Sequence, residues 1–282
     1  MFNFINDIIA YDMLRNALIV GPLITLCASV LGVSLVLKRY SMIGDGLSHV
    51  SFGVFSIATV FNFAPLVVSI PIVIFAAFLL LRINSSSKIK GDAATAIIST
   101  GSLALGVLVV SMTSGMNTNI SGFMFGSLLT ITKSDVIISI SLSIVVLLIF
   151  VLFYNKIFSV TFDETFARAT GIRAEFYNMV IAFLTAITIV LGMRMMGALL
   201  ISGLVIFPAL TSMRVFKSFI GVTICSAVIS IICFIFGFAG VFAFDTPPGA
   251  SIIIVNIIMF VLFWCINLLK RKGFYGKNKN YY

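Results

Sequence analysis

The chain has 282 residues and a formal net charge of +9; 61% of its residues are hydrophobic, 10% are charged, and its mean hydropathy is +1.21. A soluble protein of this length needs a charged surface that so few ionisable residues do not supply, so a water-soluble enzyme or binding domain is excluded. We expect an integral protein of the lipid bilayer. Nucleic acid is not an expected partner, because almost no part of the chain is predicted to lie in water.

Runs without ionisable residues divide the chain into segments that are long enough to cross a membrane. A helix needs about 20 apolar residues to cross the hydrocarbon layer. The pattern predicts an all-α, polytopic membrane helix bundle of eight or nine transmembrane helices, forming a single domain over residues 1–282. We place nine spans near residues 15–37, 43–61, 65–83, 92–112, 135–155, 176–193, 195–213, 218–243 and 249–269.

The basic residues predict the orientation of these spans. With the C-terminus in the cytoplasm, 15 of the 18 lysines and arginines fall in cytoplasmic segments, and only Arg15, Lys133 and Arg194 lie near the outer side. Cytoplasmic loops carry such an excess of basic residues. We therefore expect a basic cytoplasmic tail over residues 270–282 and an outer re-entrant or interfacial piece over residues 114–132.

The second predicted span begins with the sequence GDGLSH at residues 44–49, which contains the only histidine of the chain. Asp45 and His49 are four residues apart, so a helix places them on one face. His49 is ten residues beyond Arg39, or about 15 Å along a helix, which is half of a hydrocarbon core of about 30 Å. Such a pair can bind a divalent cation, relay a proton or form a structural hydrogen bond. Inside a membrane, ionisable groups favour a functional interpretation.

Small residues and a proline are expected to shape the surroundings of this pair. Gly44 and Gly53 flank it and leave room for a close neighbour or for an open path. Gly197 ends the turn over residues 192–197, between the sixth and seventh predicted spans. Pro208 lies within the seventh span, where a proline frees a backbone carbonyl and is expected to kink the helix.

The longest polar interruption covers residues 156–175, on the expected cytoplasmic side. Thr161 is suited to be a helix N-cap, with Asp163 and Glu164 in the first turn of a short helix. Gly171 suits the end of that helix. The pattern therefore predicts a short cytoplasmic helix between two spans.

This short helix is predicted to be amphipathic, with Phe162, Phe166 and Ala169 on one side. It would either rest on the bilayer surface or dock into a cytoplasmic partner and transmit its motion.

Motifs for nucleotide binding and ligand clusters for a catalytic metal are absent from the sequence. The chain is therefore not expected to be an enzyme. If ATP drives transport, the ATPase is expected to be another chain.

Five segments in the same order resemble the permease subunits of bacterial ATP-binding cassette (ABC) importers for manganese, zinc and iron, the ABC-3 family. They are KRYSMIGDGLSHVSFG at 38–53, GDAATAI at 91–97, FDETFARATGI at 162–172, MMGALLISGLVIFPA at 195–209 and TPPGASIIIV at 246–255.

The resemblance implies a homodimer in the bacterial cytoplasmic membrane, two cytoplasmic ATPase subunits that use ATP, and an extracytoplasmic metal-binding protein. It implies that this chain binds no cofactor and that the transported divalent ion is its substrate, with Asp45 and His49 as transient metal ligands. The residues that it implies for coupling to the ATPase are Phe162, Asp163, Glu164, Phe166, Ala167 and Gly171.

The mechanism expected from these features is alternating access, in which the partner moves the coupling helix and the path around Asp45 and His49 opens to one side at a time. Oxygen and imidazole ligands suit Mn²⁺ and Zn²⁺ alike. Import of an iron chelate, which would need a wider path and no ion ligand, remains an alternative. A proton-coupled secondary metal transporter would use Asp45 and His49 as a relay, and a membrane scaffold would transport nothing.

Overall fold

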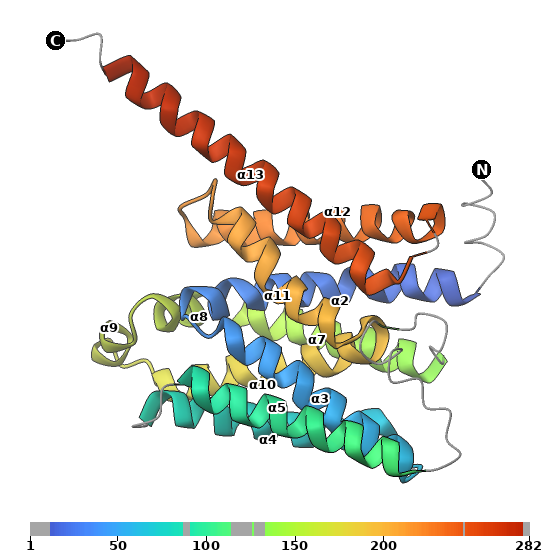
Figure 1. Cartoon of the computed structure of the whole chain (residues 1–282). Helices are drawn as coiled ribbons and strands as arrows, with labels where there is room; N and C mark the ends of the chain where they lie inside the picture. The colour runs from blue at the N-terminus through green and yellow to red at the C-terminus, as the bar shows by residue number, and fades with distance from the viewer. Residues whose placement is uncertain (1–11, 87–90, 114–125, 127–132, 245, 279–282) are drawn as a thin grey trace.

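The computed structural model describes residues 12–86, 91–113, 126, 133–244 and 246–278, and these form eleven helices without a strand (Figure 1). The helices are α2 (Asp12–Leu37), α3 (Ser41–Val60), α4 (Pro65–Ser86), α5 (Gly91–Met112), α7 (Lys133–Leu152), α8 (Tyr154–Phe162), α9 (Glu164–Ala169), α10 (Ala174–Met196), α11 (Ala198–Ser212), α12 (Phe219–Phe244) and α13 (Pro248–Asn278).

Eight helices in the described part of the chain are long and apolar enough to cross a membrane. This confirms the predicted all-α membrane bundle. α13 continues beyond the ninth predicted span, so that residues 270–278 of the predicted tail are helical. The re-entrant piece expected over residues 114–132 lies outside the described residues, apart from Gly126.

The seventh predicted span, residues 195–213, is shorter than expected. α10 continues to Met196, Gly197 separates the two helices with a φ of +86°, and α11 has only 15 residues. Its length of about 22 Å is less than the hydrocarbon thickness of about 30 Å. Most of α11 is buried among α2, α3, α12 and α13, so its ends do not have to reach the two lipid surfaces.

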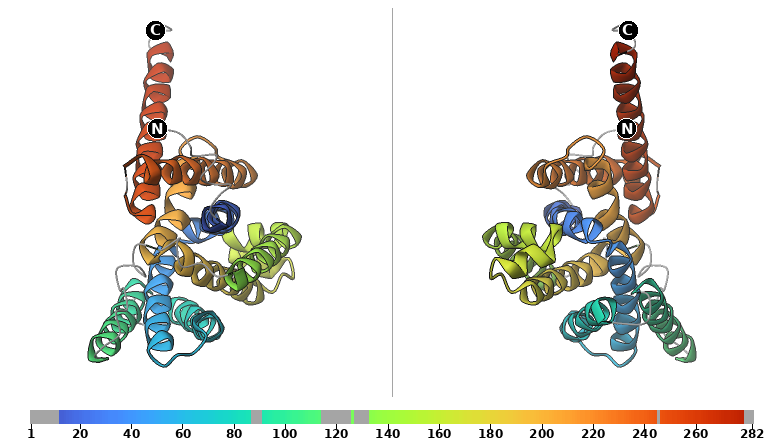
Figure 2. Two further views of the ribbon diagram at one scale, coloured as in Figure 1. Left: turned by 90° about the vertical axis from the view of Figure 1, so that its right-hand side faces the viewer. Right: turned by 90° about the vertical axis from the view of Figure 1, so that its left-hand side faces the viewer.

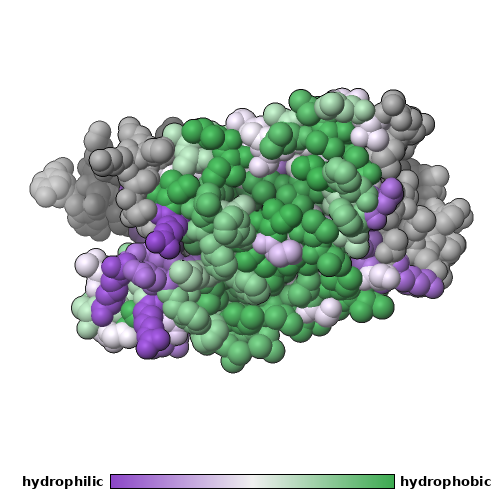
Figure 3. Space-filling view, turned by 90° about the horizontal axis from the view of Figure 1, so that it is seen from below, coloured by the Kyte–Doolittle hydropathy of each residue, from purple (hydrophilic) through white to green (hydrophobic). Residues whose placement is uncertain are grey.

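Successive long helices cross the bundle in opposite directions (Figure 1). The C-terminal ends of α2 and α13, the short helices α8 and α9, and the turn between α11 and α12 therefore gather at one end, on the left of the figure. All of these segments were predicted to be cytoplasmic from their basic residues. Figure 3 shows a broad apolar surface between hydrophilic residues at the two ends, as a membrane protein requires.

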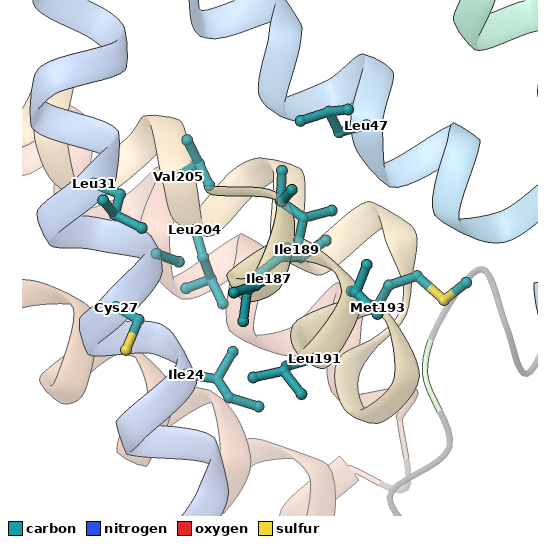
Figure 4. Close-up of a cluster of buried hydrophobic side chains, with 14 of the residues drawn as sticks. Ile24, Cys27, Leu31, Leu47, Ile187, Ile189, Leu191, Met193, Leu204 and Val205 are labelled. Carbon is teal, nitrogen blue, oxygen red and sulfur yellow. The ribbon is translucent and has the colours of Figure 1, made fainter. Parts of the chain in front are cut away.

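The core lies where α2, α10 and α11 pack against one another, as seen in Figures 2 and 4. Ile24 of α2, Leu191 of α10 and Leu204 of α11 are among its fully buried side chains. Lipid is as apolar as these side chains, so close packing rather than removal from water holds such helices together. At the end of the bundle opposite α9, Arg194 Nη2 lies 3.3 Å from Asp135 Oδ2 and joins α10 to α7.

Candidate functional site

The helix that carries the Asp-His pair starts from a tight turn. At the end of α2, Arg39 has a φ of +61°. The backbone N–H of Tyr40 donates to the Leu35 carbonyl (2.8 Å), and that of Arg39 donates to the Val36 carbonyl (3.0 Å). These two bonds form a Schellman motif, which satisfies the last carbonyls of a helix. The direction of α3 is therefore set by a fully hydrogen-bonded turn.

Asp45 and His49 face the same side of α3, as their spacing predicts. Asp45 Oδ2 and His49 Nε2 are 3.7 Å apart, and the two side chains are 40% and 27% exposed. This separation exceeds hydrogen-bonding distance. His49 Nδ1 is buried and has no hydrogen-bond partner among the described residues. Because buried polar atoms normally have a partner, this ring nitrogen retains the capacity to bind a ligand.

The pair supplies two ligand atoms of the kinds that first-row divalent metals accept, one oxygen and one nitrogen. Within the described residues, no group of three or more His, Cys, Asp and Glu side chains is placed to hold a metal ion. A closed structural site would need four such ligands. The pair is suited instead to hold an ion weakly while other positions are filled by water, by backbone oxygens or by another chain.

The glycines near the pair lie against neighbouring helices. A Cβ atom added to Gly44 would lie 3.4 Å from Val205 of α11, and one added to Gly53 would lie 2.4 Å from the Ser102 carbonyl oxygen of α5. α3 therefore approaches α5 so closely that no side chain fits at residue 53. Pro208 is buried within α11. The kink expected at Pro208 stays a prediction.

The predicted cytoplasmic helix is present as α9, but its N-cap is Asp163 rather than Thr161. Asp163 has extended backbone, and its carboxylate accepts hydrogen bonds of 2.9 Å from the backbone N–H groups of Thr165 and Phe166. The bond from Phe166 is the main reason why the pKa of Asp163 lies below its ordinary value. Thr161 cannot be the cap because α8 continues past it, to Phe162.

α9 ends at a glycine, as the sequence predicts. Gly171 has a φ of +82°, and its N–H donates to the Arg168 carbonyl. The N–H of Ile172 donates to the Ala167 carbonyl, which completes a second Schellman motif. Ile172 also packs against the buried cluster that contains Ala167, so the hydrophobic contact typical of the motif accompanies it.

Two large aromatic side chains in this segment face outward. Phe162 is 58% exposed and Phe166 is 63% exposed, whereas Ala167 is buried. The Phe162 ring also contacts Phe158 and Phe219, at centroid distances of 4.9 and 6.0 Å. Exposed aromatic rings at the polar end of a membrane bundle are candidates for contact with a partner or with the bilayer surface.

Sequence reasoning missed two residues that bind the first residue of α9. Lys38 Nζ donates to Glu164 Oε1 at 2.6 Å, and Asn178 Nδ2 of α10 donates to the same oxygen at 2.7 Å. Lys38 also donates to Asn178 Oδ1. In the sequence, Lys38 stands out only as a lysine at the end of a span. The excess of basic residues in cytoplasmic loops already accounts for such a lysine, so nothing pointed to a contact with Glu164.

The two charged groups of this contact have shifted pKa values. Burial lowers the pKa of Lys38 despite the neighbouring Glu164 carboxylate. Burial by itself raises the pKa of Glu164, but the hydrogen bonds from Lys38 and Asn178 and the nearby positive charges bring it below its ordinary value. Glu164 is therefore ionised at neutral pH.

Comparison with known proteins gives the family. The model of the ABC 3 transport family matches residues 10–267, most of the chain. The chain belongs to the ABC-3 transport family. The family and the fold class predicted from the sequence are confirmed, and membership places the chain among transport proteins.

Relatives within the ABC-3 family match over almost their whole length. The manganese import system permease protein ScaB of Streptococcus gordonii is 27% identical over 273 residues, 95% of this chain and 98% of ScaB. The high-affinity zinc uptake system membrane protein ZnuB of Buchnera aphidicola is 30% identical over 267 residues, 94% of this chain and 100% of ZnuB. The structure of PsaBC from Streptococcus pneumoniae in complex with Fab matches with a TM-score of 0.83 and 25% identity, covering 93% of this chain and 94% of that chain.

Proposed function

We propose that this chain is the membrane-spanning permease subunit of an ABC importer that moves manganese, zinc or iron ions into the cytoplasm. The observation that carries the proposal is the pair Asp45 and His49, partly exposed on a transmembrane helix of an ABC-3 chain. The pair supplies the oxygen and imidazole ligands that such ions accept. Relatives named for manganese import and for zinc uptake support the class of substrate.

The pair would be completed by a second copy of the chain. A homodimer with two-fold symmetry presents the same surface twice, so an axis passing near α3 would bring together two carboxylates and two imidazoles. Four oxygen and nitrogen ligands from flexible side chains would hold an ion in passage without trapping it. The partial exposure of both side chains supports this arrangement, because a pair buried within one protomer would be out of reach of the second copy.

Cytoplasmic ATPase subunits would dock on residues 156–175, and the exposed side chains of Phe162 and Phe166 support this contact. In this arrangement α9 and the C-terminus would lie in the cytoplasm, and an extracytoplasmic metal-binding protein would deliver the ion at the opposite end. ATP binding and hydrolysis in the partner would move α9 and rock the helices, so that the path past Asp45 and His49 opens to one side at a time.

Metal accumulation in bacteria that lack their own importers tests the proposal. The cells would express the chain with its ATPase and binding protein, and uptake of Mn²⁺, Zn²⁺ and Fe²⁺ would be measured. His49→Ala is expected to abolish uptake at an unchanged level of membrane protein. Ser51→Ala, which removes a buried hydroxyl without a hydrogen-bond partner among the described residues, is the matched control on α3 and is expected to transport normally.

Each other result points to a different function. Equal uptake by the native chain and by His49→Ala would remove Asp45 and His49 from the path. Uptake of a chelate but of no free ion would identify a chelate importer. Uptake that survives ATP depletion while a proton gradient is maintained would identify a proton-coupled transporter.

A further inference from the structure

A partly buried polar contact joins three segments that are far apart in the sequence. Lys38 follows α2, Glu164 begins α9 and Asn178 lies in α10; Lys38 is 126 residues from Glu164 and 140 from Asn178. Each of the three side chains is hydrogen bonded to the other two. The contact therefore ties the candidate coupling helix to the end of α2.

The burial of Lys38 makes this contact different from a surface ion pair. Its side chain is only 6% exposed, and Glu164 is 37% exposed. A buried charge is costly unless it is paired and hydrogen bonded, and removing one partner of such a pair is strongly unfavourable. A movement of Glu164 that left Lys38 behind would leave the buried ammonium group with Asn178 but without its carboxylate partner, so such a separation is unfavourable.

The other ion pairs of α9 do not supply such a constraint. Arg168 lies 3.9 Å from Glu164 and 3.7 Å from Glu175, but its side chain is 57% exposed. Exposed ion pairs contribute little because water and salt screen them. α9 thus has an inner contact through Glu164, while Phe166 faces outward.

From Lys38 the chain leads directly into the helix of the Asp-His pair. Lys38 stands at the Schellman turn that ends α2, and the N–H of Ile43 in the first turn of α3 donates to the Tyr40 carbonyl (2.9 Å). Lys38 Nζ also lies 5.7 Å from the centre of the Tyr40 ring. Asp45 is only seven residues beyond Lys38. Because the turn is hydrogen bonded throughout, a displacement of Lys38 is passed to the start of α3.

We propose that Lys38 is a positioning residue that transmits the movement of α9 to α3, and thereby to Asp45 and His49. Its ammonium group donates hydrogen bonds to Glu164 of α9 and to Asn178 of α10. This inference rests on the proposed ATP-driven import. The contact between Lys38 and Glu164 would couple movement of the ATPase to Asp45 and His49. Without the contact, the ATPase would still dock on α9, but its cycle would move α3 less.

The test measures metal uptake and ATP hydrolysis in the same reconstituted complex of the chain, its ATPase and its binding protein. Lys38→Met removes the charge and keeps an unbranched side chain, and Glu164→Gln keeps the size of its partner. Each is expected to lower the number of ions imported per ATP by at least about fivefold, the lower end for coupling between two sites. ATPase assembly and hydrolysis are expected to persist in Lys38→Met, because residue 38 lies outside the proposed docking segment, residues 156–175. Lys217→Met, at an exposed lysine between α11 and α12, is expected to leave the ratio unchanged.

Exchanging the charges of Lys38 and Glu164 gives a further test of the same contact. The double variant Lys38→Glu with Glu164→Lys restores an ion pair and is expected to recover part of the lost ratio, which a variant that merely misfolds would not do. An unchanged ratio in both single variants would overturn the proposal. If the native complex hydrolyses ATP but imports no ion, the proposed function fails.

A distance measurement tests whether movement of α9 is transmitted to α3, even if the native complex imports no ion. Spin labels at residues 61, after α3, and 246, before α13, would be introduced with the native cysteines replaced. ATP is expected to change the distance between them in the native background and to change it less in Lys38→Met. An equal change in both would contradict the role of Lys38.

Discussion

Gly53 of α3 lies directly against Ser102 of α5, and a Cβ atom at residue 53 would be 2.4 Å from the Ser102 carbonyl oxygen. A Cβ at Gly106 would likewise lie 2.8 Å from the Gly53 Cα. Small residues allow two membrane helices to approach this closely. The helix that carries Asp45 and His49 is therefore held against α5 by backbone contact.

Gly53→Val is expected to destabilise the chain by about 1–3 kcal/mol, the usual cost of overpacking a well-packed contact. Thermal unfolding of the purified protein in detergent would measure the change. Gly101→Ala on α5 is the matched control, because a Cβ at that residue meets no atom within 4 Å. A Gly53→Val protein as stable as the native one would show that α3 and α5 separate easily.

The cap of α9 is expected to matter for coupling to the ATPase. Asp163→Ala removes the acceptor for the Thr165 and Phe166 N–H groups, so α9 should begin to fray and ATP-driven uptake should fall. Asp163→Asn should preserve most of the uptake, because asparagine caps helices about as well as aspartate. Limited proteolysis would report the order of α9. Equal uptake by Asp163→Ala and the native chain would contradict this role.

The exposed ring of Phe166 is expected to contribute to docking of the ATPase. Phe166→Ala should leave the fold intact, because the ring is 63% exposed, and should reduce co-purification of the ATPase. Phe75→Ala, at an equally exposed ring on α4, should retain the partner fully. If both variants retained it equally, the contact would have to lie elsewhere in residues 156–175.

The contact between Lys38 and Glu164 is expected to weaken as pH falls into the acid range, where the Glu164 carboxylate is protonated. Because the pKa of Glu164 is lowered in the folded chain, the unfolded chain binds the proton first, and stability falls as pH falls. The contribution is complete above the ordinary glutamate pKa of about 4.3 and is lost as pH drops through the lower folded value. Melting temperatures of the native chain and of Glu164→Gln should therefore differ at neutral pH and converge as pH falls through the lowered pKa of Glu164. A difference that disappeared above pH 5 would argue against this pairing.

The candidate metal pair was predictable because its geometry is local. If residues 41–60 form a helix, Asp45 and His49 must share one of its faces. The observed separation of 3.7 Å between Asp45 Oδ2 and His49 Nε2 follows from their four-residue spacing. The end of α9 at Gly171 was predictable for a similar reason, since glycine accepts a positive φ without steric cost. The predicted N-cap of α9, Thr161, was wrong because threonine and aspartate both cap helices well. Only the length of α8 decides between Thr161 and Asp163.

Composition and the spacing of charged residues were enough to predict the membrane class, the positions of most spans and the order in which they cross. Lipid offers no hydrogen bonds to the backbone, so an apolar run of sufficient length must form a spanning helix. Two features required the folded chain: α11 is a short, buried helix, and Lys38 contacts Glu164, which is 126 residues away in the sequence. Both depend on which helices become neighbours, and that is set by packing between side chains that no local pattern relates.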